Sequence, residues 1–526
     1  MKMKKLPVFV ALIGLVACAS SCNGAKYDNY FKPHRGEWAS TYRSLRLNGN
    51  GYSFEQYSKI LDMEAEKEYY AVTKVKALVV PVDFLDYPAS SLPKGEEGTK
   101  EELYTAVFGN AEDTSWQSLR SYYDSVSYGQ CKISGTVTDW FHTNITTTQF
   151  AGGKNFGPNK EYTGATKENA TQQLAKAIEK EYFGPGKLNM DDYDANKDGA
   201  IDSIIMIYSA PHHSVAGSNV DQDTFWAYCW SVNGATGGAY RYFWCSYYFF
   251  LEGQEDVADP KLNCRTLIHE FGHVIGAPDY YDTDYRNNPD GKQYSPLGGV
   301  DMMDHNIGDH NSFTKGIYGW TAPYIVDGDA NITINSTTDT GDYVIIPMPG
   351  KWYDRDDTSN RWDGTLLDQY LMIEFVTPTG VCEADSKVSQ NGFGDYWFSN
   401  AGFRVTHVDA RLGMWDHDGN FKNYTIKTSS GSGYYIDFAA DNSGSRCAFK
   451  YGNDRLISVV SATGNPWKSR GNASVKNEDL FYEGGVIEDF YFFNRAGKQE
   501  DLLPYKITFG KINGTESASI QIRVVK

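Results

Sequence analysis

Residues 266–282 read TLIHEFGHVIGAPDYYD, and this stretch decides what the rest of the chain is expected to support. His269 and His273 are four residues apart, so on a helix both imidazoles project from one face and can reach one metal ion. Glu270 lies between them and can act as a general base towards water at such an ion. Apolar residues at helical spacing would pack this helix into a core, namely Leu267, Ile268, Phe271, Val274 and Ile275. The pattern is that of a zinc hydrolase.

The residues after the second histidine predict the end of the helix. Gly276 allows a left-handed turn, and Pro278 prevents the helix from continuing. Such a turn can bring the Asp279 carboxylate round as a third metal ligand. The five-residue pattern alone also fits an amphipathic helix with solvated or buried histidines. That helix would have no need for a glycine turn followed by a carboxylate.

A second element follows shortly after the candidate third ligand. Residues 298–304 read GGVDMMD and look like the methionine turn that lies beneath the zinc ion in metzincin-type peptidases. A pair of methionines is more often core filler, so its place in the chain is what gives it weight. Met303, the second of the pair, aligns best with the turn methionine.

The first residues predict an export signal. Lys2, Lys4 and Lys5 precede an apolar run over residues 6–17 that is too short to span a bilayer comfortably. The run ends in Leu-Val-Ala-Cys18, which resembles a bacterial lipobox with Cys18 as the acylated residue. Cys22 is a weaker second candidate, and an ordinary signal peptide with a soluble product is the alternative. We therefore expect a lipoprotein signal peptide over 1–17 and a linker or short pro-segment over 18–74.

Composition agrees with an exported globular protein of 526 residues, of which 15% are aromatic. The 49 basic and 67 acidic residues give a formal charge of −18, which argues against nucleic acid or an anionic membrane surface as a partner. Membrane contact is expected only through the N-terminal lipid, and the protein is expected to be a monomer. The cysteines form no recognisable disulfide framework, with Cys229 and Cys245 as the most plausible local pair.

The order of predicted elements indicates two regions. Strand patterns over 75–84, 131–140 and 204–208 alternate with helix patterns over 101–108, 118–123 and 167–182, and the metal helix follows. This predicts an α/β (α+β) domain with a mixed sheet over residues 75–323. Short alternating runs with turns between them then predict a β-rich, sandwich-like region over residues 324–526.

An aspartate-rich stretch lies between the long helix and the metal helix. Oxygen-bearing side chains alternate there with Gly199 at the bend, as in an EF-hand-like calcium loop. Ile205 stands where an EF-hand has its bidentate glutamate, so the loop is not an EF-hand proper, and a bare polar turn is the alternative. The expected Ca²⁺ ligands are Asp194, Asn196, Asp198, the carbonyl of Ala200, and Asp202.

Several segments in order resemble the immune inhibitor A family of secreted bacterial zinc metallopeptidases. Besides the metal motif, they are LVVPVDF at 78–84, SLRSYYDSVSYG at 118–129, the aspartate-rich loop, FWAYCW at 225–230, DMMD at 301–304, KGIYGW at 315–320 and GFRVTHVD at 402–409. The resemblance implies a metzincin-like fold with His269, His273 and Asp279 as zinc ligands, Glu270 as catalytic base and Met303 in the methionine turn. The chain departs from the family at Pro211-His212-His213, where a glycine-rich loop is usual.

The expected function is therefore that of a zinc-dependent endopeptidase that hydrolyses proteins or peptides outside the cell. The oxyanion-stabilising donor is left open among Tyr280, Tyr281, Tyr318 and His305. The expected location is the bacterial cell envelope or surface if the lipid is attached, or the medium if it is not. The alternative is a catalytically silent surface lipoprotein that uses a peptidase-like fold only to bind. A complete His, Glu, His and Asp set argues against it.

Overall fold

The computed structural model describes residues 28–31, 74–167, 169–195, 199–234, 239–254, 260–283, 295–348, 366–388, 396–416, 420–423, 434–443, 455–464, 474–493 and 499–525. The predicted signal peptide, Cys18, nearly all of the predicted linker, Asn196 and Asp198 lie outside these ranges. Among the described residues, no helix combines the length and the apolar character needed to span a bilayer.

The first half of the chain is built on a six-stranded sheet. Its strand order is β3-β2-β5-β7-β6, with β4 beside β2. All pairs are parallel except β6 with β7, so β6 is an antiparallel edge strand and the sheet is mixed, as predicted. The strands are β2 (Lys74–Asp83), β3 (Lys132–Val137), β4 (Phe141–His142), β5 (Ser203–Tyr208), β6 (Tyr228–Asn233) and β7 (Ala239–Ser246).

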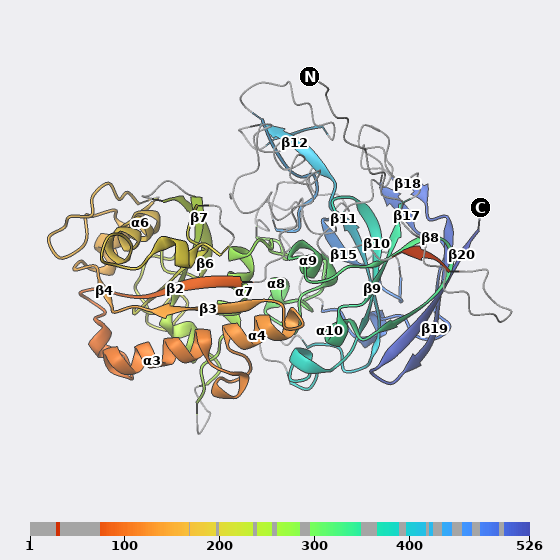
Figure 1. Ribbon diagram of the computed structural model, residues 1–526, viewed down its shortest axis with the longest axis horizontal. Coiled ribbons are helices and arrows are strands. Elements are labelled where there is room, and N and C mark those ends of the chain that lie inside the picture. Colours follow the sequence, from red (N-terminus) through yellow and green to blue (C-terminus); the bar gives the residue numbers. More distant parts are fainter. Residues whose placement is uncertain are drawn as a thin grey trace, which may run out of the picture.

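Helices cover both faces of this sheet (Figure 1). On one face α3 (Gly95–Phe108), α4 (Leu119–Val126) and α7 (Arg265–Val274) share one hydrophobic core. On the other face α6 (Ala170–Tyr182) packs into a second core. The shorter helices are α5 (Thr147–Ala151), α8 (Met302–His305), α9 (Ser312–Ile317) and α10 (Thr337–Thr340). The predicted helix over 101–108 begins six residues earlier than expected because Glu96, Glu97 and Lys100 form polar first turns that carry no periodic apolar signal.

The second half is β-rich, as predicted, and centres on a nine-stranded sheet with the order β15-β11-β10-β9-β8-β20-β19-β16. A short N-terminal strand, β1 (Asp28–Phe31), pairs with β8 and completes it. The main strands are β8 (Tyr324–Asn335), β9 (Tyr343–Pro347), β10 (Gln369–Val376), β11 (Gly402–Asp409), β15 (Ile457–Val459), β16 (Val486–Ile487), β19 (Tyr505–Asn513) and β20 (Ser517–Val524).

Two small sheets complete the β-rich half. They contain β12 (Leu412–Asp416), β13 (Phe421–Asn423) and β14 (Tyr434–Phe438) in one, and β17 (Tyr491–Phe493) and β18 (Gln499–Leu502) in the other. The sandwich arrangement and the boundary near residue 323 remain predictions.

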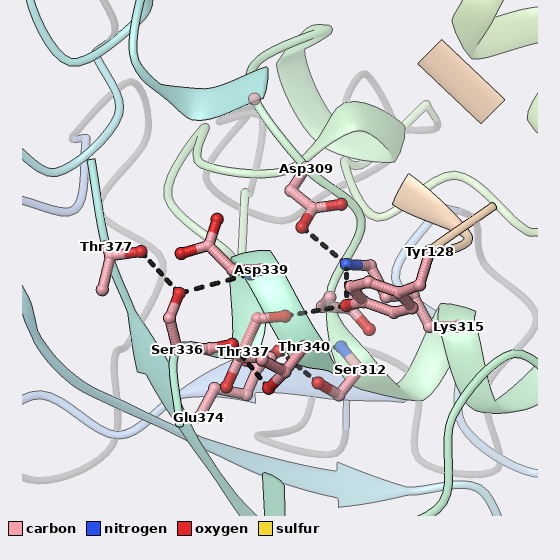
Figure 2. Close-up of polar contacts among 12 residues, drawn as sticks. Tyr128, Asp309, Ser312, Lys315, Ser336, Thr337, Asp339, Thr340, Glu374 and Thr377 are labelled. Atoms are coloured by element: carbon pink, nitrogen blue, oxygen red, sulfur yellow. Dashed lines mark hydrogen bonds and ion pairs between the residues drawn. The ribbon is translucent and has the colours of Figure 1, made fainter. Parts of the chain in front are cut away.

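The two halves meet through buried polar groups as well as through one continuous hydrophobic core. Figure 2 shows Lys315 of α9 at this junction, with its ammonium 2.6 Å from Asp309 and donating to the Tyr128 hydroxyl at 2.7 Å. Tyr128 in turn donates to the backbone carbonyl of Thr337 at 2.7 Å. Because a buried charge is costly unless it is paired, such a junction requires both halves to be in place.

The local disulfide expected between Cys229 and Cys245 is wrong. Neither cysteine takes part in a disulfide among the described residues. In the register of β6 and β7, Cys229 lies opposite Phe243, so Cys245 is only a diagonal neighbour. Diagonal partners in antiparallel strands are roughly 7–8 Å apart, which is too far for a disulfide.

Candidate metal centre

Helix α7 presents the two histidines of the motif side by side. The rings of His269 and His273 lie 4.9 Å apart at 83°, and the helix buries nearly all of its residues. Arg241 of the neighbouring strand β7 donates to the backbone carbonyl of His273 at 2.6 Å. A cation at this end of a helix satisfies an unpaired carbonyl and opposes the negative end of the helix dipole.

The turn after α7 brings a carboxylate to the same place. Gly276 has a φ of 119°, which confirms the prediction that a glycine turns the chain here. Asp279 Oδ1 consequently lies 3.1 Å from the Nε2 atom of both His269 and His273. The three possible ligand atoms all lie within 4.8 Å of one another, and they form the group that the described residues offer to a metal ion.

Backbone carbonyls fix the orientation of both imidazoles. Nδ1 of His269 donates to the carbonyl of Met302, and Nδ1 of His273 donates to the carbonyl of Ala277, each at 2.8 Å. With Nδ1 held by a carbonyl, each imidazole turns its Nε2 atom towards Asp279, and in the neutral form it can offer the Nε2 lone pair to a metal ion. This second set of contacts has no signal in the sequence, because it depends on carbonyl groups and not on side chains.

The charge on Asp279 is held by its two neighbours. Burial alone would raise the pKa of this carboxyl group, but His273 and His269 together outweigh burial through charge and hydrogen bonding. The net effect holds the pKa of Asp279 well below its usual value. The carboxylate is therefore an anionic ligand at neutral pH.

Glu270 is a buried carboxylate beside this group. It accepts a hydrogen bond from the backbone N–H of Cys229 on strand β6, while its Oε2 atom has no partner among the described residues. Burial raises the pKa of Glu270 to about 7, with His269 opposing and Asp279 reinforcing the shift. A carboxylate with this pKa can both take up and release a proton near neutral pH.

The predicted methionine turn lies under α7. An added Cβ atom on Gly272 would come within 2.5 Å of the Met303 sulfur, so this part of the helix rests directly on that side chain. The backbone N–H of Tyr280 also donates to the carbonyl of Met303 at 2.9 Å. The turn therefore contacts both the helix and the segment that carries Asp279.

The structure separates the four candidates for an oxyanion donor. The hydroxyl of Tyr280 is buried against Thr314 at 2.6 Å, and that of Tyr318 donates to the carbonyl of Gly272 at 2.8 Å. Tyr281 instead makes a hydrogen bond to Asp279, and its ring stacks at 6.4 Å on that of His305. Of the four, Tyr281 therefore contacts a residue of the metal group directly, and His305 lies next to it.

Three further histidines take part in aromatic packing. His212 stacks on Phe249 at 4.1 Å, and His213 lies against Trp226 at 4.5 Å, so both belong to an aromatic cluster beyond the end of β5. His310 is buried against Tyr122 and further tyrosine rings.

In the predicted calcium loop the described carboxylates accept backbone N–H groups. Asp202 accepts from Lys76 at 3.0 Å and from Ala195 at 3.2 Å, and Asp194 accepts from Gly199 at 2.9 Å. Ala200 is described but Asn196 and Asp198 are not, so the Ca²⁺ site stays a prediction.

Much of the first half of the chain is similar to known proteins. Residues 64–298 match the family described as immune inhibitor A peptidase M6, catalytic domain. Immune inhibitor A of Bacillus thuringiensis subsp. alesti is 24% identical over 237 residues, which cover 41% of this chain and 34% of that protein. The pre-pro-metalloprotease PrtV of Vibrio cholerae serotype O1 is 22% identical over 253 residues, which cover 40% of this chain and 25% of that protein. The chain thus spans about a third or less of the length of these relatives. Residues 64–298 belong to the immune inhibitor A family of M6 peptidases.

Proposed function

We propose that the protein is a zinc-dependent endopeptidase that hydrolyses peptide bonds of proteins outside the cell. The observation that carries this proposal is the convergence of His269, His273 and Asp279 within 4.8 Å beside a buried glutamate. Two imidazole nitrogens and one carboxylate oxygen form a three-residue ligand set of the kind that catalytic zinc sites use, with a fourth position left for water. Both imidazoles are already held with Nε2 towards the common point, so the residues fit the ion.

Zinc, when bound, supplies a Lewis acid that polarises water and the scissile carbonyl. Glu270 then acts as general base: its unpartnered Oε2 takes the proton from the attacking water and passes it to the leaving amine. The bound cation would lower the pKa of Glu270 from about 7 and favour the ionised base. Tyr281, whose hydroxyl is hydrogen-bonded to Asp279, is the nearest candidate to donate to the developing oxyanion.

The edge of β6 is the natural place for an extended substrate. The N–H of Cys229 points away from β7, since it donates to Glu270, so the catalytic carboxylate lies in line with the outer edge of this strand. An extended peptide that paired with that edge would pass its carbonyl groups along the metal centre. Trp230 on the same strand is 54% exposed and available to such a peptide.

Export and lipid attachment belong to the same proposal. The basic start, the short apolar run and Cys18 favour a mature protein that begins at Cys18 and is tethered to the cell envelope by its lipid, or released. Its substrates would then be extracellular proteins or peptides, with no nucleic acid partner expected from the charge of −18.

The Glu270→Gln variant tests the reaction, because glutamine keeps the shape of the side chain but cannot accept the proton. We expect kcat on casein to fall by roughly 10²- to 10⁴-fold while zinc content, measured by mass spectrometry of the purified protein, stays at the wild-type level. Unchanged cleavage would exclude Glu270 as the base. A wild-type protein that holds zinc but cleaves neither casein nor gelatin would favour the silent surface lipoprotein.

A further inference from the structure

Three charged side chains of the β-rich half reach into the methionine turn. They are Glu374 on β10, Asp385 after β10, and Arg404 on β11, and all three are buried. Each of them has a hydrogen-bond partner between residues 300 and 312, a range that we call the turn segment and that contains α8. This segment begins beyond the family match, which ends at residue 298.

Arg404 holds the entrance of the turn segment. Its Nε atom donates to Glu374 at 2.8 Å, across the paired strands β10 and β11, and Nη1 donates to the backbone carbonyl of Val300 at 2.9 Å. The second carboxylate oxygen of Glu374 accepts from both the backbone and the hydroxyl of Ser312 at 2.8 Å. One buried ion pair of the β-rich half therefore fixes both ends of the segment.

Asp385 holds the middle of the same segment and the start of α7. It accepts two hydrogen bonds from Arg265, at 2.7 and 3.0 Å, and one from the backbone N–H of Gly308 at 2.7 Å. Arg265 is the first residue of α7, and its Nη1 also donates to the carbonyl of Asn306 at 2.7 Å. Asp385 thus ties the helix of the metal motif to the turn beneath it.

The turn segment in turn orients a metal ligand. The carbonyl of Met302 accepts from Nδ1 of His269, two residues after the carbonyl that Arg404 holds. A displacement of Val300 would move Met302 and would release the imidazole from the orientation that presents Nε2. Outer contacts of this kind alter metal affinity without touching the ion.

We propose that Arg404 and Asp385 are positioning residues of the metal centre. The β-rich half consequently contributes to the peptidase site by holding the segment that orients His269. The inference rests on the proposed function, because it assigns these residues a role in holding the zinc ligand His269. By this inference the catalytic unit extends beyond residue 404, whereas the family match ends at residue 298.

The test compares two conservative variants of the full chain. Arg404→Lys keeps the positive charge but loses the guanidinium group, whose two nitrogens donate to Glu374 and to the Val300 carbonyl at the same time. Arg411→Lys is the matched control, since Arg411 makes an equally buried pair with Asp409, at 2.6 and 2.7 Å, within the β-rich half. Zinc dissociation constants are measured by competition with a chromophoric chelator, and the visible spectrum is recorded with Co²⁺ in place of zinc.

We expect Arg404→Lys to weaken zinc binding by roughly 10-fold or more and to shift the Co²⁺ band, and Arg411→Lys to leave both within twofold of wild type. Asp385→Asn should behave like Arg404→Lys, and it decides the question if Arg404→Lys does not fold. The inference is overturned if the folded positioning variant, Arg404→Lys or Asp385→Asn, shows wild-type zinc affinity and a wild-type Co²⁺ spectrum. This outcome differs from failure of the proposed function, because the wild-type enzyme still cleaves casein. A wild-type protein that binds no zinc would overturn the proposed function and this inference together.

Discussion

At the scale of single residues, the metal centre depends on one carboxylate that two imidazoles keep ionised. Asp279 is half-buried, and its Oδ1 lies 3.1 Å from both Nε2 atoms. The Nε2 atoms and the Asp279 oxygen converge on one point, and the same three atoms would face a bound cation. In the proposed ligand set, Asp279 thus supplies the negative charge that two histidines alone could not supply.

Replacing Asp279 by alanine should consequently lower zinc affinity by on the order of 100-fold or more, because a ligand and a negative charge are lost together. Zinc content after dialysis against a weak chelator measures this, with Asp139→Ala as control, since Asp139 is an exposed carboxylate paired with Lys100. Full zinc occupancy in Asp279→Ala would remove Asp279 from the ligand set.

At the scale of elements, the contact between α7 and α8 sets how closely the metal helix approaches the methionine turn. Gly272 allows this contact, because a Cβ atom there would lie 2.5 Å from the Met303 sulfur and 3.2 Å from the Tyr123 hydroxyl. Tyr123 donates to the carbonyl of Ile268 at 2.8 Å, so it cannot move away without losing a buried hydrogen bond.

Gly272→Ala should therefore lower the free energy of unfolding by about 1–3 kcal/mol, as overpacking of a core usually does. Urea unfolding of the metal-free protein measures the change. In Gly272→Ala with Met303→Ala, the missing side chain makes room for the new methyl group, so the two costs should be less than additive. Strict additivity would mean that the helix and the turn do not press on each other.

At the scale of the whole molecule, stability depends on a core that runs through both halves. His407 of β11 lies in that core, with Nε2 donating to Gln369 at 3.0 Å and with the rings of Phe490 and Phe492 beside it. Burial lowers the pKa of His407 from 6.5 to about 4. The folded protein thus holds this imidazole neutral over a range in which the unfolded chain would protonate it.

The sign of the pH dependence follows. Above pH 6.5 the imidazole is neutral in both states and contributes nothing, whereas between pH 6.5 and 4 only the unfolded chain binds the proton. The folded state should lose up to about 3 kcal/mol over this range. His407→Gln should unfold with a shallower dependence on pH between 7 and 4 in thermal melts of the metal-free protein. A dependence as steep as that of the wild type would assign the acid sensitivity to other groups.

The sequence by itself determined the parts of this protein that depend on local spacing. Histidines at helical separation, a glycine that must take a positive φ, and the alternation of strand and helix patterns are all readable along the chain, because they act over fewer than about 20 residues. The metal helix, its turn and the β-rich second half were predicted for this reason. The structure places Asp279 beside both Nε2 atoms, and its role as a metal ligand stays a prediction.

Only the tertiary structure decided which groups surround those residues. Three contacts join distant positions: the carbonyl of Met302 at His269, the N–H of Cys229 at Glu270, and the guanidinium of Arg404 at Val300, which are 33, 41 and 104 residues apart. Each of these contacts uses a backbone carbonyl or N–H group, so no residue type marks that partner in the sequence. Arg404 itself appears in the sequence only as a charged residue within a strand pattern, and its partners become evident only when β10, β11 and the methionine turn meet in one buried place.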